Sequence, residues 1–159
     1  MKSTRLERFR NRRNLPLIAA PMFLVSGVEL VVAACRNGVI GSFPTVNCRS
    51  TEQLDAWLTE IETRLQQHSD ASGNKPAPIC PNLIVHRSNA RLAQDLQVLL
   101  RHKPEIVITS VGSPAPVLAP LRDAGALVFA DVAPIRHADR AVAAGAGGLA
   151  LLAAGAAGP

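Results

Sequence analysis

Short apolar runs alternate with longer segments of helical periodicity along almost the whole chain. The runs have the length of strands, and they occupy 17–20, 39–42, 79–85, 106–109, 127–130 and 149–152. The segments between them place apolar residues three and four positions apart, which is the period of a helix buried on one face. Six strands and five helices in strict alternation indicate βαβ units, in which the strands are parallel and the crossovers right-handed.

Two segments carry the clearest local signals. Ser50 and Gln53 can cap a long amphipathic helix, which we expect to end near His68, before a loop at 69–78 that is rich in Ser, Gly, Asn and Pro. The dense β-branched run at 106–109 is typical of a strand buried on both faces of a parallel sheet. Because the alternation resumes directly after 69–78, this loop is not predicted to be a domain linker.

The composition fits one globular domain, with 48% hydrophobic and 18% charged residues. The chain has 159 residues, fewer than the roughly 250 of a complete eight-stranded barrel. Its positive charge lies mainly near the start, so we divide it into a basic leader, 1–13, and a domain, 14–159. The leader could contact nucleic acid or an anionic membrane, or it could be part of a transit peptide. More simply, it could form a solvated turn that packs Leu6 and Phe9 on the domain. Aromatic residues make up only 3%, too few to stack on bases, and we predict no nucleic-acid partner.

Membrane, metal and disulfide chemistry find little support in the sequence. No apolar stretch approaches the length of a membrane span, so we predict a cytoplasmic protein with no membrane partner. Cys35, Cys48 and Cys80 are odd in number and too far apart for a zinc or redox motif, which predicts buried, reduced thiols. No carboxylate or histidine cluster has metal-ligand spacing, and no GxGxxG or P-loop motif is present, so no metal is predicted.

Periodicity alone fits a doubly wound sheet as well as a barrel. In both architectures the binding residues follow the carboxyl ends of the strands. There the sequence places Met22, Asn82, the segment 110–113 and Asp131. Several of these residues are small or polar, which lets a backbone or an amide side chain approach a flat cofactor. Asp131 could orient substrate polar groups, but it could equally cap a helix.

Six short motifs in consecutive order resemble the amino-terminal part of the nitronate monooxygenase family, formerly called 2-nitropropane dioxygenases. They read AAPM at 19–22, GVIGS at 38–42, PNL at 81–83, ITSVG at 108–112, DV at 131–132 and AGAGGL at 144–149. The resemblance extends over about 14–158. It implies an α/β fold, an incomplete (β/α)8 TIM barrel, that binds FMN and oxidises alkyl nitronates with O2. A related flavin barrel, the FMN-type enoyl reductase, shares much of this pattern, but the loop 82–89 favours the monooxygenase.

The resemblance also implies which residues contact the cofactor. Met22 would support the isoalloxazine ring, and Asn82 would hydrogen-bond it. The full set of implied cofactor-binding residues is Met22, Asn82, Thr109, Ser110, Gly112 and Gly155. No catalytic residue is fixed by the resemblance; His86, in the loop after the third strand, is a candidate.

The sequence also departs from the family pattern. Pro159 stands where a catalytic histidine is expected, and the glycine-rich turns that hold the flavin phosphate would follow strands seven and eight. Two hypotheses therefore remain. The first is an FMN-dependent nitronate monooxygenase impaired by truncation, with a nitronate and O2 as its small-molecule partners. The second is a catalytically inactive, truncated half-barrel that self-associates, for instance as a homodimer through its open sheet edges.

Overall fold

A computed structural model describes residues 7–12 and 15–152 of the chain, in which six strands form one parallel sheet. The strands are β1 (Ile18–Ala19), β2 (Ile40–Pro44), β3 (Ile79–Ile84), β4 (Ile106–Ser110), β5 (Leu127–Val132) and β6 (Gly148–Leu151). They lie side by side in sequence order, whereas a doubly wound sheet reverses its order at a switch point. The sequential order confirms the predicted incomplete (β/α)8 barrel.

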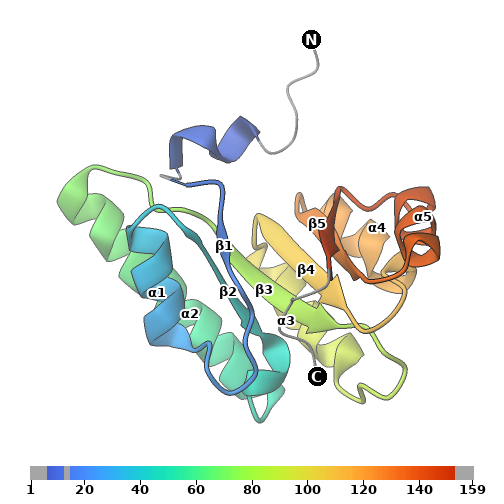
Figure 1. Ribbon diagram of the computed structural model, residues 1–159. Helices are drawn as coiled ribbons and strands as arrows, with labels where there is room; N and C mark the ends of the chain where they lie inside the picture. Colours follow the sequence, from blue (N-terminus) through green and yellow to red (C-terminus); the bar gives the residue numbers. More distant parts are fainter. Residues whose placement is uncertain (1–6, 13–14, 153–159) are drawn as a thin grey trace.

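Helices connect the strands on the outside of the curved sheet (Figure 1). The described α-helices are α1 (Val28–Arg36), α2 (Thr51–Ser72), α3 (Leu92–His102), α4 (Ala115–Asp123) and α5 (Ile135–Ala143). Two short 3-10 helices, η1 (Glu7–Arg12) and η2 (Thr45–Asn47), precede β1 and follow β2. None of the helices in this described part of the chain has both the length and the apolar character to cross a bilayer.

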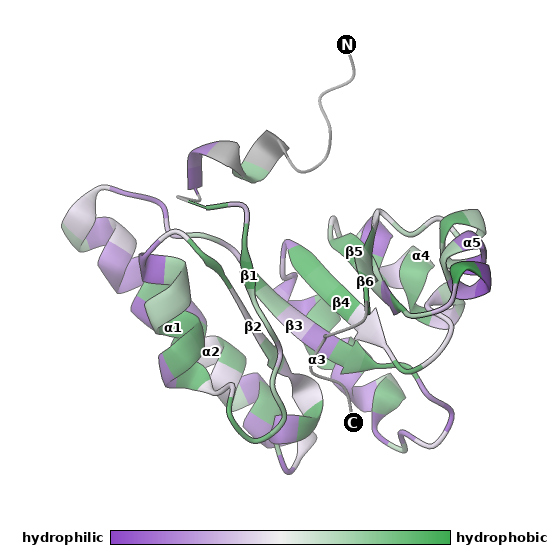
Figure 2. Ribbon diagram, in the orientation of Figure 1, coloured by the Kyte–Doolittle hydropathy of each residue, from purple (hydrophilic) through white to green (hydrophobic). Residues whose placement is uncertain are grey.

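Side chains of the strands alternate between the helix layer and the inner face of the sheet. Val107 and Val128 pack outward, in a large cluster with the buried faces of α1, α2, α3 and α4. Ile106, Ile108 and Leu127 pack inward, in a second cluster built from the strands and η1. Figure 2 shows the strands as mostly hydrophobic and α2 as largely polar on its outer surface. Every second strand position is therefore an inner-face position.

Phe9 of η1 closes the amino end of the inner face, where it is fully buried against Ile40, Cys80 and other inner residues. Arg12 follows it, donating from Nε to the Pro76 carbonyl at 3.0 Å and pairing with Glu105. The predicted packing of Phe9 on the domain is thus confirmed. Leu6 lies outside the described residues.

Helix α2 is longer than the sequence predicts. Its start follows the expected capping arrangement, since Ser50 Oγ accepts from the Gln53 amide at 3.2 Å. Its end, however, is at Ser72 and not near His68, because Gln66 donates to Asp70 across the additional turn and Gly73 supplies the left-handed C-cap at φ 71°. The polar residues at 69–72 continue the solvated face of the helix, and the loop begins only after them.

Buried thiols agree with the sequence prediction. Cys35, Cys48 and Cys80 are all free and buried. Burial raises the pKa of Cys35 to about 11 and that of Cys48 to about 12. Thiols with such pKa values are poor nucleophiles at neutral pH, so they serve as small apolar core residues.

Leu58 tests the packing of α2 on the sheet, because its side chain is fully buried in the outer cluster. We expect Leu58→Ala to lower the free energy of unfolding by about 2–5 kcal/mol through lost apolar contacts and a residual cavity. Urea unfolding measures the change. Gln67→Ala, on the exposed side of the same helix, is the control and should change stability by less than about 0.5 kcal/mol. Equal effects of the two substitutions would contradict this packing.

Candidate functional site

Three polar side chains share the inner face at the carboxyl ends of β3, β4 and β5. Asn82, Ser110 and Asp131 each lie two residues beyond an apolar residue that belongs to the inner cluster or packs against it. Strand alternation therefore directs all three side chains to the same face. Toward the amino ends that face is mostly apolar, and Ser42, the polar side chain there, is buried and donates to the Cys80 carbonyl. The polar side chains with capacity left for a ligand therefore lie at the carboxyl ends.

Asn82 and Ser110 form a reciprocal hydrogen-bonded pair. Asn82 Nδ2 donates to Ser110 Oγ at 3.0 Å, and Ser110 Oγ donates to Asn82 Oδ1 at 3.3 Å. The two residues are 6% and 7% exposed. An amide carries two N–H donors and a carbonyl with two lone pairs, so the pair fixes the orientation of Asn82 while leaving one N–H and one lone pair for a ligand.

Thr109 does not share this face. It precedes Ser110 by one residue, and its hydroxyl donates to the Phe129 carbonyl at 3.2 Å. By alternation its side chain belongs to the helix-facing set that includes Val107. A contact between Thr109 and a ligand would therefore use the backbone, whereas Ser110 can use its side chain.

The other predicted positions lie in the loops beyond β3 and β4. His86 is exposed, and its Nδ1 is engaged by the hydroxyl and amide of Ser88 at 2.7 and 3.2 Å. Gly112 lies against Val85, and a Cβ at this glycine would sit 3.2 Å from the Val85 carbonyl oxygen. Glycine thus allows the loop after β4 to approach the loop after β3. Gly155 lies outside the described residues.

Two loops at the carboxyl ends contain non-glycine residues in the left-handed region. Leu24, after β1, has φ 59°, and Val111, after β4, has φ 57°. This conformation costs about 1–2 kcal/mol for a residue with a Cβ, and it persists only where surrounding contacts enforce it. Met22 begins the first of these turns with its side chain 42% exposed. Backbone strain therefore accumulates around the same end of the barrel as the polar pair.

A cavity of about 510 Å³ lies between the loop after β4 and α5. Val111, Ser113, Asp131, His137 and Arg140 are among its lining residues. Neither His137 nor Arg140 follows from a sequence motif. Their three-residue spacing on the helix that follows Asp131 is the signal that could have placed them here.

The carboxyl of Asp131 is the titratable group of this cavity with a shifted pKa. Burial raises the pKa of Asp131 above its ordinary value. Among the described residues its carboxylate has neither a hydrogen-bond donor nor an ion-pair partner that would offset this penalty. A half-buried carboxyl of this kind, in a cavity at the carboxyl ends of barrel strands, is a candidate to exchange protons with a ligand.

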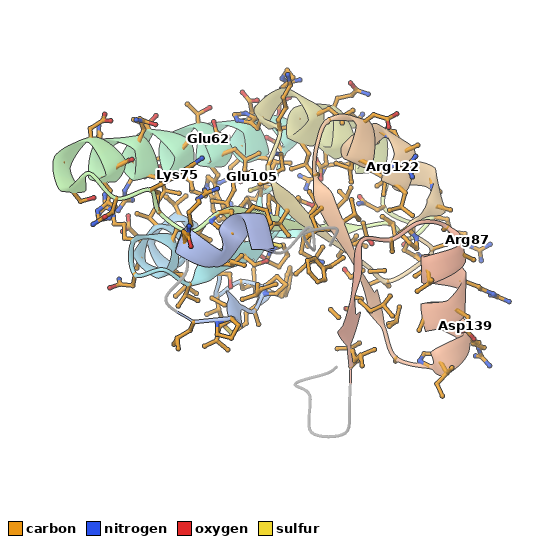
Figure 3. The ribbon with its side chains drawn as sticks, turned by 90° about the horizontal axis from the view of Figure 1, so that it is seen from above. Glu62, Lys75, Arg87, Glu105, Arg122 and Asp139 are labelled. Carbon is orange, nitrogen blue, oxygen red and sulfur yellow. The ribbon has the colours of Figure 1, made fainter. Side chains whose placement is uncertain are left out.

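A second cavity, of about 580 Å³, lies at the opposite end of the barrel. Glu62, Lys75 and Glu105 contribute to its lining, and Figure 3 shows these side chains around α2 and η1. Its charged groups are largely engaged in packing the fold, since Glu62 pairs with His102 at 3.0 Å and Glu105 pairs with Arg12. The amino-terminal face of a barrel serves stability, whereas the ligand sites lie at the carboxyl ends.

Within 7–12 and 15–152, no three His, Cys, Asp or Glu residues are grouped closely enough to hold a metal ion. The polar side chains at the carboxyl ends are an amide, hydroxyls, one carboxyl, and the imidazole and guanidinium of His137 and Arg140. Such a set suits hydrogen bonding to an organic ligand.

Comparison with known proteins supports the fold. No protein-family model and no curated protein matches this sequence. Among solved structures, the chain is similar to FabK from Thermotoga maritima, with 18% identity and a TM-score of 0.75 over 94% of this chain. It is also similar to nitroalkane oxidase from Streptomyces ansochromogenes, with 20% identity and a TM-score of 0.73 over 92% of this chain.

A third similar structure is the enoyl reductase domain of MlnA from Bacillus amyloliquefaciens, with 16% identity and a TM-score of 0.67 over 84% of this chain. The chain spans less than half of each of these structures, 43% of FabK, 47% of the nitroalkane oxidase and 32% of the MlnA domain. At such identities the likeness establishes the shared (β/α) barrel architecture.

Asp131 makes stability depend on pH in a defined direction. Its folded-state pKa is raised, so the native state is penalised once the carboxyl ionises, and this penalty is absent below the unfolded pKa of about 3.9. We expect Asp131→Asn to stabilise the protein at pH 7 by about 0.5 kcal/mol. The advantage should vanish as the pH falls through the folded-state pKa. Urea unfolding between pH 4 and 7.5 tests this, and Asp139→Asn, exposed on α5, is the control. An advantage that persists or grows at low pH would contradict the assignment.

Proposed function

We propose that this chain contributes the ring-binding half of an FMN site in a flavin-dependent (β/α) barrel, and that the reaction is oxidation of an alkyl nitronate by O2. The observation that carries the proposal is the Asn82–Ser110 pair. It is a buried, oriented amide at the carboxyl end of a barrel, with hydrogen-bonding capacity left over. The resemblance of the motifs to nitronate monooxygenases implies that Asn82, Ser110 and Met22 contact the same cofactor, which supports the proposal.

The described residues fit the ring of a flavin. Isoalloxazine has a flat apolar face and a polar edge, so its protein site needs an apolar surface and a few fixed donors and acceptors. Asn82 supplies a donor and an acceptor from the inner face. Met22 supplies apolar surface from the loop after β1, and Gly112 permits close approach of the loop after β4.

The cavity between the loop after β4 and α5 suits the nitronate. FMN, when bound, supplies the electron acceptor and the reactivity toward O2. Arg140 would balance the negative charge of the nitronate oxygens, and the apolar lining around Val111 would take the alkyl group. Asp131 would hold or release a proton at its carboxyl oxygens, because its raised pKa favours the protonated form nearer neutral pH. The likeness to a nitroalkane oxidase structure supports chemistry at a nitro group.

FMN binding is the first test. The purified chain, titrated with FMN, should quench flavin fluorescence and retain a flavin absorption band through gel filtration. Asn82→Ala should weaken the affinity about tenfold or more, since it removes the ring's oriented amide. Asn74→Ala, in the loop after α2 at the other end, should leave the affinity unchanged. If wild-type protein binds no FMN, the proposal fails; if Asn82→Ala binds as tightly as wild type, the assignment of the ring site fails.

With FMN bound, O2 consumption on addition of propyl-2-nitronate tests the reaction, and its absence at saturating flavin would refute the nitronate assignment.

A second candidate function, self-association, is favoured by the apolar surface at the two sheet edges. Leu17 beside β1 and Leu151 and Leu152 at β6 are 52%, 70% and 46% exposed. Strand edges with exposed apolar residues are sites of pairing between chains. We expect sedimentation velocity to show dimers that increase with protein concentration. Leu151→Lys should shift the protein to monomer, and Leu30→Lys on α1 should not. Monomeric wild-type protein at all concentrations would exclude this candidate.

A further inference from the structure

The turn after β1 holds apolar side chains in an unusual backbone conformation. The Met22 carbonyl accepts hydrogen bonds from the amides of Val25 and Ser26 at 3.3 and 3.0 Å, which closes the turn. Leu24, at the third position, has φ 59°, the sign that a type II turn requires there and for which glycine is preferred. Met22, Phe23, Leu24 and Val25 are all exposed, from 42% to 78%. Figure 2 shows the loop between β1 and α1 as a hydrophobic segment.

Asn47 of η2 uses its whole amide to hold this turn. Its Nδ2 donates to the Met22 carbonyl at 3.1 Å and to the Ser26 carbonyl at 2.8 Å, and its Oδ1 accepts from the Leu24 amide at 3.0 Å. Asparagine suits this role because it offers two donors and an acceptor on a short side chain. Aspartate would lack the donors. The bond to Leu24 stabilises the one residue of the turn whose backbone is strained.

The backbone on both sides of Asn47 is itself held by hydrogen bonds from Arg91. Arg91, immediately before α3, donates to the Cys48 carbonyl at 2.8 Å and the Thr45 carbonyl at 3.3 Å, on both sides of Asn47. Its guanidinium also pairs with Asp95 at 3.3 Å, and Asp95 is fully buried in α3. Arg91 thus holds the backbone on both sides of Asn47, and Asn47 in turn holds the exposed turn, which links the helix layer to that turn. A buried side chain of the turn, Ser26, adds a bond from its hydroxyl to the Ala20 carbonyl at 3.1 Å.

Such rigid support for exposed apolar residues is not explained by packing within the described chain. The side chains of the turn contribute little buried area, yet the backbone carries strain that several polar groups maintain. Strain of this kind is retained where a fixed conformation serves a ligand. The turn follows a strand at the carboxyl end, where the inner-face amide of Asn82 also lies.

We propose that Asn47 is a positioning residue of the flavin site, which holds the Met22–Val25 turn so that its apolar side chains meet the flat ring without further ordering. This inference rests on the proposed FMN site. A preorganised turn spares the entropy of ordering on binding, so releasing it should weaken binding although Asn47 does not touch the ligand.

The test compares wild type with Asn47→Ala, Asn37→Ala and the double variant Asn47→Ala with Leu24→Gly. Asn37 is the matched control, because its Nδ2 also donates to a backbone carbonyl, that of Ala33 at 2.8 Å, but at the end of α1. Three quantities are measured on the full chain: hydrogen exchange of the 22–26 amides without FMN, the FMN dissociation constant, and the absorption spectrum of bound flavin.

We expect Asn47→Ala to speed exchange at the Leu24 amide and to raise the FMN dissociation constant about tenfold, with an altered flavin spectrum at saturation. Asn37→Ala should change none of the three. The double variant should recover only the part of the affinity that is lost to backbone strain, because glycine adopts the left-handed conformation freely but lacks the Leu24 side chain and leaves the free turn less ordered. If wild type binds FMN but Asn47→Ala binds it equally well with an unchanged spectrum, the positioning role is wrong and the flavin site stands. If wild type binds no FMN, both proposals fall, and faster exchange at Leu24 would then show only a structural clamp.

Discussion

The two-residue alternation of the strands determines which side chains of this barrel can reach a ligand. Ser110 meets Asn82 on the inner face, whereas Thr109, one residue earlier, is turned toward the helices and bonds the Phe129 carbonyl. The same alternation places Ile108 and Cys80 deeper on the inner face, where they seal it with apolar surface. Because both partners of the polar pair are buried, each must satisfy the other when no ligand is present. The pair is therefore a structural requirement of the barrel, and under the proposed function it would also be a preset recognition element.

Stability and strain are separated between the two ends of the barrel. At the amino end Phe9 fills the inner face, and Arg12 ties the leader to Glu105 and the Pro76 carbonyl. The left-handed residue at that end, Lys103, is the C-cap of α3, where such a conformation is common. At the carboxyl end, Leu24 and Val111 adopt it in exposed turns that a glycine would form more easily. The molecule thus accepts strain where ligands bind in barrels and avoids it where the core is sealed.

Much of the fold could be predicted from the sequence, because periodicity reports directly on which residues are buried. The dense apolar run at 106–109 and the capping pair at Ser50 and Gln53 were sufficient for β4 and the start of α2. The end of α2 could not be predicted, because polar residues at 69–72 suit a loop and an exposed helical turn equally well. Periodicity also did not distinguish a barrel from a doubly wound sheet, and the sequential strand order decides between them. The resemblance selected Asn82 and Ser110 individually, but their mutual bond depends on strand register. The role of Asn47 could not be predicted, because it arises from contacts with a turn more than twenty residues earlier in the chain.

The exposed apolar residues connect the two proposed functions physically. Met22–Val25 and Val111 lie in the loops that follow β1 and β4, while Leu151 and Leu152 lie at the edge of the sheet. Any molecule that covers one of these surfaces in the native state, and not in the unfolded chain, stabilises the fold in proportion to its concentration and affinity. The two surfaces meet at the cavity beside α5, because Val111 of the first and Leu152 of the second both line it. The bonds from Asn47 hold the Met22–Val25 turn in one conformation, which suits a rigid planar ligand better than a polypeptide that could adapt to it.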